Sequence, residues 1–294
     1  MVQYLTPPPD PNPRKPRFVV PQGAWDCQIH LFGPRDRYPF DPDSPYVSDP
    51  VLPETAVALQ ETLGLARQVV VSGGGYGLDY QHLVDTLQQF PGRFVGVIFP
   101  SARTTDAEFE RLHGLGVRGV RFVSRGRAKN LPQIDADVAA RIKPLDWPIH
   151  FYPTGTDLLE YADALLALPC DKLVLDHFGG VPAAMGIDQP AFKCLLQMLD
   201  TGRVWVKLSG PMRCTKEEPP YPSVTPLAHA LVAHAPERMV WGSDWPHVNM
   251  VGRTMPNDGD LIDLVREWVP DDSVREQIFV TNPRTLYGAE ELPS

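Results

Sequence analysis

The chain enters its first predicted strand at Trp25-Asp26-Cys27-Gln28-Ile29-His30-Leu31-Phe32, between a Pro-rich lead and a break at Gly33-Pro34. Side chains of a strand alternate between its two faces, so Asp26, Gln28 and His30 are predicted to share one face. Polar groups gathered on one face are unusual in a sheet that is buried on both sides. We therefore expect this face to look into a polar site. The opposite face is predicted to carry the packing residues Cys27, Ile29 and Leu31.

Seven further apolar runs of strand length follow, and helical patterns separate each run from the next. Eight such units in a chain of 294 residues predict an α/β fold of the (β/α)8 TIM barrel type. An open doubly wound sheet is the alternative, but no Gly-x-Gly-x-x-Gly motif follows the first strand, and Gly73-Gly74-Gly75 is only a weak phosphate-loop signal. The predicted strands start near residues 26, 68, 94, 118, 148, 172, 204 and 239.

Residues 1–22 are predicted to form a Pro-rich N-terminal arm ahead of a single catalytic barrel domain at 23–294. Proline fixes φ and lacks a backbone N–H, so this segment favours extended conformations and cannot build a helix or a central strand. The arm either lies over the barrel or a partner subunit, or it forms a disordered tail, and the sequence leaves both open. We expect the protein to be a monomer or a homodimer.

Composition narrows the class of partner. The formal charge of −9 argues against nucleic acid and against acidic membrane surfaces, although a local arginine cluster would still bind a small anion. No apolar run reaches the roughly 18 residues of a transmembrane helix, and no signal-peptide pattern opens the chain. The four cysteines form no C-x-x-C pair, so we expect no disulfide framework or Cys-rich zinc site, and a cytoplasmic location.

Barrel enzymes carry their active sites at the carboxyl ends of the strands and in the loops that follow. Asp244 ends the last strand within Trp241-Gly242-Ser243-Asp244-Trp245-Pro246-His247, and such a carboxylate needs partners that strand-end histidines supply. A strand-end histidine can also simply satisfy a buried carbonyl, and His150 is compatible with either a lining or a structural role. The polar residues at the strand ends are Gln28, His30, Ser72, Arg121, Tyr152, His177, Ser209 and Asp244.

Several motifs together resemble an amidohydrolase-superfamily barrel. The narrower resemblance is to the amidohydrolase-related branch that includes 2-pyrone-4,6-dicarboxylate lactonase, sulfomuconolactone hydrolase and galactarolactone isomerase. It runs in motif order from Gly23 to Tyr287, so it is specific for the branch but not for the substrate. The motifs are Asp26-Cys27-Gln28-Ile29-His30, Asp176-His177-Phe178-Gly179, the Trp241–His247 stretch, Asn282-Pro283 and Leu286-Tyr287-Gly288.

One departure from the resembling family concerns metal. The family usually opens with His-x-His on the first strand, and Gln28 stands at the first of these positions. An amide is a poor ligand for a transition metal, and the remaining set of His30, His177 and Asp244 is thin. We therefore expect neither a metal ion nor another cofactor. A metal-dependent hydrolase or decarboxylase stays an alternative, as does an inactive ligand-binding homologue in which Gln28 has replaced a ligand.

The resemblance implies hydrolysis of a carboxylated lactone, with Asp244 as general base. His30 and His177, together with Gln28, would polarise the carbonyl of the substrate. A lactone isomerase using the same site is the other enzymatic alternative. The family's arginine after His177 is missing here, which suggests a substrate with fewer or differently placed carboxylates. The substrate-binding residues that the resemblance implies are Ser72, Arg121, Arg127, Tyr152, Arg213 and Asn249.

Overall fold

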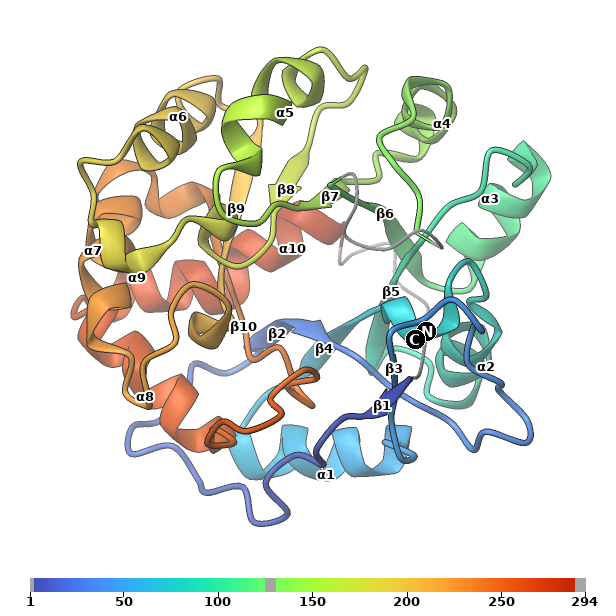
Figure 1. Ribbon diagram of the computed structural model, residues 1–294, viewed down its shortest axis with the longest axis horizontal. Helices are drawn as coiled ribbons and strands as arrows, with labels where there is room; N and C mark the ends of the chain where they lie inside the picture. Colours follow the sequence, from blue (N-terminus) through green and yellow to red (C-terminus); the bar gives the residue numbers. More distant parts are fainter. Residues whose placement is uncertain (1–2, 125–130, 289–294) are drawn as a thin grey trace.

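Eight parallel strands form the central sheet of the computed structural model, which describes residues 3–124 and 131–288 (Figure 1). Each strand pairs with the next along the chain, so the (β/α)8 barrel predicted from the sequence is confirmed. The strand positions also agree with the prediction. The strands are β2 (Trp25–Ile29), β4 (Arg67–Val71), β5 (Phe94–Ile98), β6 (Val117–Val123), β7 (Ile149–Tyr152), β8 (Leu173–Leu175), β9 (Val204–Ser209) and β10 (Met239–Gly242).

Helices surround the strands on the outside of the barrel (Figure 1). Their first turns carry side-chain caps in several cases: Thr105 accepts a hydrogen bond from the backbone N–H of Glu108, and Asn257 accepts one from Gly259. The apolar faces of strands and helices meet in one large core cluster. The helices are α1 (Pro53–Leu63), α2 (Gln81–Gln89), α3 (Asp106–Gly114), α4 (Ala136–Ile142), α5 (Asp157–Leu166), α6 (Pro190–Leu199), α7 (Thr225–His234), α8 (Asp258–Trp268), α9 (Asp272–Glu276) and α10 (Asn282–Tyr287).

In the first strand, β2, the side chains are not divided between the two faces as predicted. The pairing of β2 with β4 shifts register between Asp26 and Ile29, as at a β-bulge. Cys27 therefore packs with inward-facing residues of the other strands rather than with the helices, and the expectation that it faces outward was wrong. Gln28 still turns inward, because the extra residue allows two consecutive side chains to do so. The cluster around Cys27 contains Trp25, Val69, Val71, Val95, Val97, Val174, Trp205, Val240, Leu286 and Tyr287.

Asp26 joins the two ends of the sheet instead of facing the site. Its carboxylate accepts hydrogen bonds from the backbone N–H of Ser243 at 2.9 Å and from the Ser243 hydroxyl at 2.6 Å. Backbone bonds from Asp244 N to Gln28 O and from His30 N to Trp245 O continue the contact. Strand β2 is thus closed against β10, and His30 and Asp244 come to lie side by side.

The final helix, α10, closes the end of the barrel at which the strands begin. In Figure 1, α10 lies behind the ring of strands. Tyr287 of α10 stacks on Trp25 with ring centroids 6.1 Å apart, and His150 stacks on the same tyrosine at 5.9 Å. These stacked rings therefore fill the floor of the barrel, at the end away from the carboxyl ends of the strands.

Residues of the N-terminal arm lie against the barrel. The short strand β1 (Tyr4–Leu5) pairs in parallel with β3 (Tyr46–Val47), which belongs to the long loop after β2. Further along, the backbone N–H groups of Arg14 and Arg17 donate to Asn257 and Asp263. No helix within the two described ranges is long and apolar enough to cross a membrane.

Candidate active site

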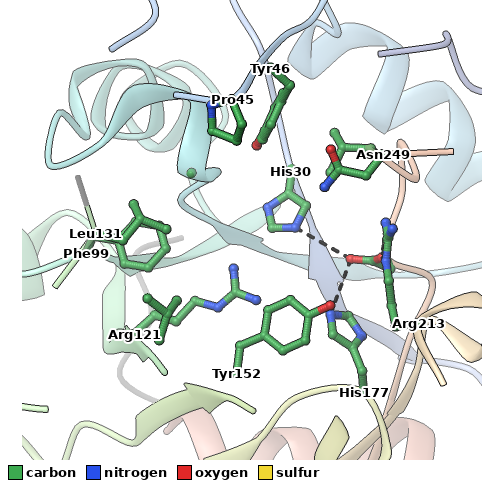
Figure 2. Close-up of a pocket in the computed structure, with 14 residues that line it drawn as sticks. His30, Pro45, Tyr46, Phe99, Arg121, Leu131, Tyr152, His177, Arg213 and Asn249 are labelled. Atoms are coloured by element: carbon green, nitrogen blue, oxygen red, sulfur yellow. Dashed lines mark hydrogen bonds and ion pairs between the residues drawn. The ribbon is translucent and has the colours of Figure 1, made fainter. Parts of the chain in front are cut away.

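A cavity of about 310 Å³ lies at the carboxyl ends of the strands, and Figure 2 shows its labelled side chains converging on one space. Its chemistry is divided between a polar side, built on β2, β8, β9 and β10, and an apolar side near β5 and β6. Such a division suits a small polar molecule that has an apolar portion. The lining residues are His30, Pro45, Tyr46, Gly74, Phe99, Arg121, Val123, Leu131, Tyr152, His177, Arg213, Asp244, Val248 and Asn249.

Asp244 is the central acidic group of the cavity. It follows β10 with φ of 69°, a left-handed conformation that is costly for a residue other than glycine. Its Oδ2 accepts from Nε of Arg213 and pairs with a terminal guanidinium nitrogen, both at 2.7 Å. Its Oδ1 faces Nε2 of His30 at 3.5 Å and Nε2 of His177 at 3.7 Å. One carboxylate oxygen is thus held by an arginine, and the other is directed toward the two histidines.

The charge state of Asp244 follows from this setting. Burial alone would raise the pKa of its carboxyl, but Arg213, His177 and His30 outweigh burial and hold the pKa well below 3.8. The residue is therefore ionised throughout the neutral pH range.

His177 lies between β8 and a short 3-10 turn at Phe178–Gly180, and its φ of 51° is again left-handed. Its Nδ1 lies 3.0 Å from the hydroxyl of Ser209 and 3.3 Å from the Ser209 carbonyl. Burial lowers the pKa of His177 to about 4, although the carboxylates of Asp244 and Asp176 raise it. The imidazole is therefore neutral at pH 7. When the Ser209 hydroxyl donates to Nδ1, the ring proton is on Nε2 and points toward Asp244.

In His30 the proton is held on the other ring nitrogen, Nδ1, by a backbone carbonyl. Its Nδ1 lies 2.8 Å from the carbonyl oxygen of Val71, which can only accept, so Nδ1 carries a proton. Its Nε2 faces Asp244 and also lies 3.4 Å from the amide nitrogen of Gln28. In its neutral form His30 therefore presents an unprotonated Nε2 to the cavity. It can donate to a substrate carbonyl, as the sequence predicted, only when both ring nitrogens are protonated.

A second buried charge network lies below the cavity. Arg121 contacts Oδ2 of Asp176 through Nε at 2.9 Å and a terminal nitrogen at 2.8 Å. The ammonium group of Lys207 lies 3.0 Å from Oδ1 of the same carboxylate. Burial would raise the pKa of Asp176, but Lys207 and Arg121 outweigh it and hold that pKa well below 3.8. Asp176 thereby fixes Arg121, whose side chain points into the cavity in Figure 2.

The remaining predicted residues fall into three groups. Tyr152 and Asn249 line the cavity with Arg121 and Arg213. Gln28 is fully buried beneath it, and Ser72 is buried outside its lining, with a hydroxyl that has no hydrogen-bond partner among the described residues. Arg127 lies outside the described residues.

His150 is also buried below the cavity. Its Nδ1 lies 3.8 Å from Asp176, and burial lowers its pKa to about 3. The structural role that the sequence left open for His150 fits this position, because its ring does not line the cavity.

Sequence reasoning missed two polar residues. Lys207 is fully buried in the middle of β9, and the signal for it was a lysine inside the apolar run Val204–Leu208. Tyr46 belongs to the long loop after β2 and lines the cavity, where its oxygen accepts from the backbone N–H of Gly75 at 3.2 Å. Burial raises the pKa of Tyr46 to about 12, so its hydroxyl keeps its proton and can donate to a ligand.

A divalent metal ion does not fit these side chains. The amide oxygen of Gln28 already accepts from the ammonium of Lys207. Arg213 pairs with Asp244, and Lys207 pairs with Asp176, so cationic side chains already neutralise both carboxylates. Among the residues of the two described ranges, no three His, Cys, Asp or Glu side chains form a group that could hold a metal ion. A metal at this place would have to displace buried cations from their partners.

Fold and site together define a (β/α)8-barrel enzyme with one carboxylate and two histidines at the carboxyl ends of its strands. The chain belongs to the amidohydrolase family, which its sequence matches over residues 25–289. The resemblance drawn from the motifs is thereby confirmed.

Relatives cover nearly the whole chain. A 4-sulfomuconolactone hydrolase of Rhizobium radiobacter is 38% identical over 92% of each sequence. A 2-pyrone-4,6-dicarboxylate hydrolase of Comamonas testosteroni is 36% identical over 96% of this chain and 95% of its own. A D-galactarolactone isomerase of Agrobacterium fabrum is 32% identical over 94% and 93%. A crystal structure of an Agrobacterium tumefaciens protein superposes with a TM-score of 0.80 at 29% identity, over 93% of this chain and 98% of the other.

Proposed function

We propose that this protein hydrolyses the ring ester bond of a lactone that carries at least one carboxylate, without using a metal ion. Relatives 36–38% identical over more than nine-tenths of the chain are lactone hydrolases by name, which supports a hydrolase acting on a cyclic ester. The observation that carries the proposal is the ionised Asp244. Arg213 occupies one of its oxygens and leaves Oδ1 directed toward His30 and His177.

Asp244 is proposed as the general base. Water placed between Oδ1 of Asp244 and Nε2 of His30 can donate one hydrogen to each, which aligns its oxygen for attack on the lactone carbonyl. As the new C–O bond forms, Oδ1 takes the proton of the water. The ring C–O bond then breaks, and Asp244 returns the proton to the departing ring oxygen. The products are a carboxylic acid, which ionises by releasing its proton to solvent, and a hydroxyl group on one opened chain.

His177 is proposed to stabilise the oxygen of the attacked carbonyl. With Nδ1 accepting from the Ser209 hydroxyl, its Nε2–H is available to the oxyanion. Donors of this kind typically contribute about 10²–10³ in rate. His30 adds a second donor only in its doubly protonated form, because its Nδ1–H already donates to the carbonyl of Val71.

Arg121 and Arg213 are proposed to receive the substrate carboxylate. Both line the cavity, and each is oriented by a buried carboxylate, which leaves part of each guanidinium for a ligand. Tyr46 also lines the cavity and supplies a neutral hydroxyl donor. The apolar wall formed by Phe99, Val123 and Leu131 is suited to the carbon skeleton of the ring.

Replacement of the base tests the mechanism. Asp244→Asn is expected to lower kcat by at least about 10²–10⁴ while substrate binding changes little, because the amide cannot accept the proton. Hydrolysis over a panel of five- and six-membered carboxylated lactones supplies the assay. Asp200→Asn, which alters a surface pair with His234, is the matched control. Near-normal turnover by Asp244→Asn refutes the assignment.

Lactone isomerisation is the second candidate, and the 32% identical galactarolactone isomerase is the observation that favours it. The same base and carbonyl donor would serve, with a hydroxyl of the substrate in place of water. Product analysis by NMR separates the two: a ring-opened acid supports hydrolysis, and a lactone of different ring connectivity supports isomerisation.

A further inference from the structure

The first described residues of the N-terminal arm reach the rim of the cavity. Where β1 pairs with β3, the backbone N–H of Tyr4 donates to the Pro45 carbonyl at 3.2 Å. The backbone N–H of Thr6 donates to the Val47 carbonyl at 2.9 Å. Pro45 and Tyr46 of the partner segment line the cavity. In Figure 1, β1 and β3 lie in front of the barrel and α10 lies behind it, so the arm borders the end that carries the candidate site.

The side chains of Tyr4 and Thr6 both contact Asn249, which lies in the loop after β10 and lines the cavity. Thr6 is only 3% exposed, and its Oγ1 accepts from the backbone N–H of Asn249 at 3.0 Å. The Tyr4 hydroxyl donates to Oδ1 of the Asn249 side chain. Residues two apart in an extended segment share one face, so this short stretch of the arm holds Asn249 by its main chain and by its amide.

Asn249 is an exposed rim residue with φ of 66°, a left-handed conformation that residues other than glycine adopt rarely. Burial raises the pKa of Tyr4, although the guanidinium of Arg213 lowers it in part, so the hydroxyl is protonated at neutral pH and can donate. With Oδ1 accepting from Tyr4, the amide nitrogen is the group that Asn249 can offer to a carboxylate in the cavity. The arm therefore fixes both a rarely adopted main-chain conformation and the orientation of the amide.

A second set of contacts anchors the arm farther along the chain, near the start of α8. The backbone N–H of Arg14 donates to Oδ1 of Asn257 at 3.0 Å, and the guanidinium of Arg14 pairs with Asp260. Nδ2 of Asn257 donates to the carboxylate of Asp10 and to the carbonyl of Asn12, each at 2.9 Å. These contacts do not involve Tyr4 or Thr6, so substitutions at those two positions perturb only the end of the arm at the cavity.

We propose that the N-terminal arm is a functional part of the active site, in which Tyr4 and Thr6 are positioning residues that hold Asn249 in the orientation that binds the substrate. The catalytic meaning of this proposal rests on the proposed hydrolysis, whereas the contacts of Asn249 with the arm belong to the protein without substrate. A Pro-rich segment outside the repeated strand–helix units thereby acquires a role in substrate affinity.

Kinetics with a hydrolysed lactone separate positioning from general stability. Tyr4→Phe removes only a hydroxyl, and Thr6→Val removes the acceptor from a side chain of nearly the same shape. Each variant is expected to raise KM about 2–10-fold with kcat nearly unchanged, because one hydrogen bond to a binding residue is lost. Thr6→Ser retains the hydroxyl and should restore the wild-type KM. Leu5→Thr is the control, since Leu5 is 52% exposed and its side chain lies on the other face of β1.

A double-mutant cycle tests whether Tyr4 acts through Asn249. Asn249→Ala is expected to raise KM at least as much as Tyr4→Phe, and adding Tyr4→Phe to Asn249→Ala should raise it no further. The proposal is overturned if Tyr4→Phe has its full effect on KM in the Asn249→Ala background. An unchanged KM in Tyr4→Phe or in Thr6→Val overturns it for that residue, as does a Thr6→Ser variant that is as impaired as Thr6→Val.

Hydrogen exchange measured by mass spectrometry tests the contact without a substrate. The peptide that contains Asn249 is expected to exchange faster in Thr6→Val than in the wild-type protein or in Thr6→Ser, because the N–H of Asn249 loses its acceptor. Equal exchange in the three proteins contradicts the proposal. If no lactone is hydrolysed, the proposed function fails, while the exchange measurement still decides whether the arm holds Asn249.

Discussion

Removing the guanidinium of Arg213 should change the acid–base behaviour of Asp244. Two nitrogens of Arg213 lie 2.7 Å from Oδ2, and the side chains of both residues are largely buried. Arg213→Gln removes the largest of the contributions that oppose burial, so the pKa of Asp244 should rise. A neighbouring arginine typically lowers the pKa of an aspartate by about 1–3 units, which corresponds to about 1.4–4 kcal/mol.

The assay is the pH dependence of kcat, which reports groups in the enzyme–substrate complex. The acidic limb is expected to move up by about 1–3 pH units in Arg213→Gln. Arg253→Gln is the matched control, because Arg253 donates to the carbonyls of Met212 and Thr215 on the same loop. A uniform fall in kcat at every pH, with the acidic limb in its original place, would refute the reasoning and leave Arg213 as a binding residue only.

The free energy of unfolding should also depend on the pairing of Arg213 with Asp244. The depressed pKa of Asp244 means that its contribution to the free energy of unfolding is present above the unfolded pKa of about 3.9 and is lost as pH falls through the folded value. Breaking the buried pair should cost about 3–5 kcal/mol at pH 7. Because protonation relieves the isolated carboxylate, the deficit of Arg213→Gln should shrink as pH falls. Urea denaturation at several pH values measures both effects.

Three further outcomes are expected. Burial raises the pKa of Asp26 to about 7, so the folded state holds a proton that the unfolded state loses near pH 4. The free energy of unfolding should therefore fall by up to about 4 kcal/mol between pH 4 and 7. Urea titrations of Asp26→Asn should lack this dependence on pH. Gly180→Ala places a Cβ 2.3 Å from the carbonyl oxygen of Pro153 at φ of +66° and should lower Tm, whereas Gly155→Ala, with open space at φ of +59°, should lower it less. Dialysis against a chelator should leave lactone hydrolysis unchanged, and stoichiometric zinc in the active protein would contradict metal independence.

The sequence was sufficient to predict the barrel because its signal is repetitive. Each strand is a short apolar run followed by a helical pattern, and eight repeats define a closed sheet. The same logic brought His30, His177 and Asp244 together, since strand ends converge on one face and closure places the first strand beside the last. The cavity lining agrees for these three residues.

The features that the sequence did not reveal depend on the pairing register of a strand, on how deep a side chain lies in the barrel and on the path of a loop. Alternation along Trp25–Phe32 assigned Cys27 to the wrong face because a bulge adds one residue to β2, and no residue type in the stretch marks that shift. Lys207 was passed over because it lies in the middle of a strand, one layer below the strand ends. Tyr46 comes from a loop whose path cannot be read from periodicity.

The closure of the barrel has a consequence for how the protein is made. The bond between Ser243 and Asp26 joins positions 217 residues apart, and α10, which covers Trp25, is synthesised later still. While the chain emerges from the ribosome, β2 therefore has neither its neighbour on one edge nor the helix that shields its inward face. Contacts of such separation form slowly, and unpaired apolar strands favour aggregation. A nascent chain that stops before Ser243 would keep an open barrel, and one that stops before Tyr287 would leave Trp25 uncovered, so completion of the fold awaits the C-terminal segment.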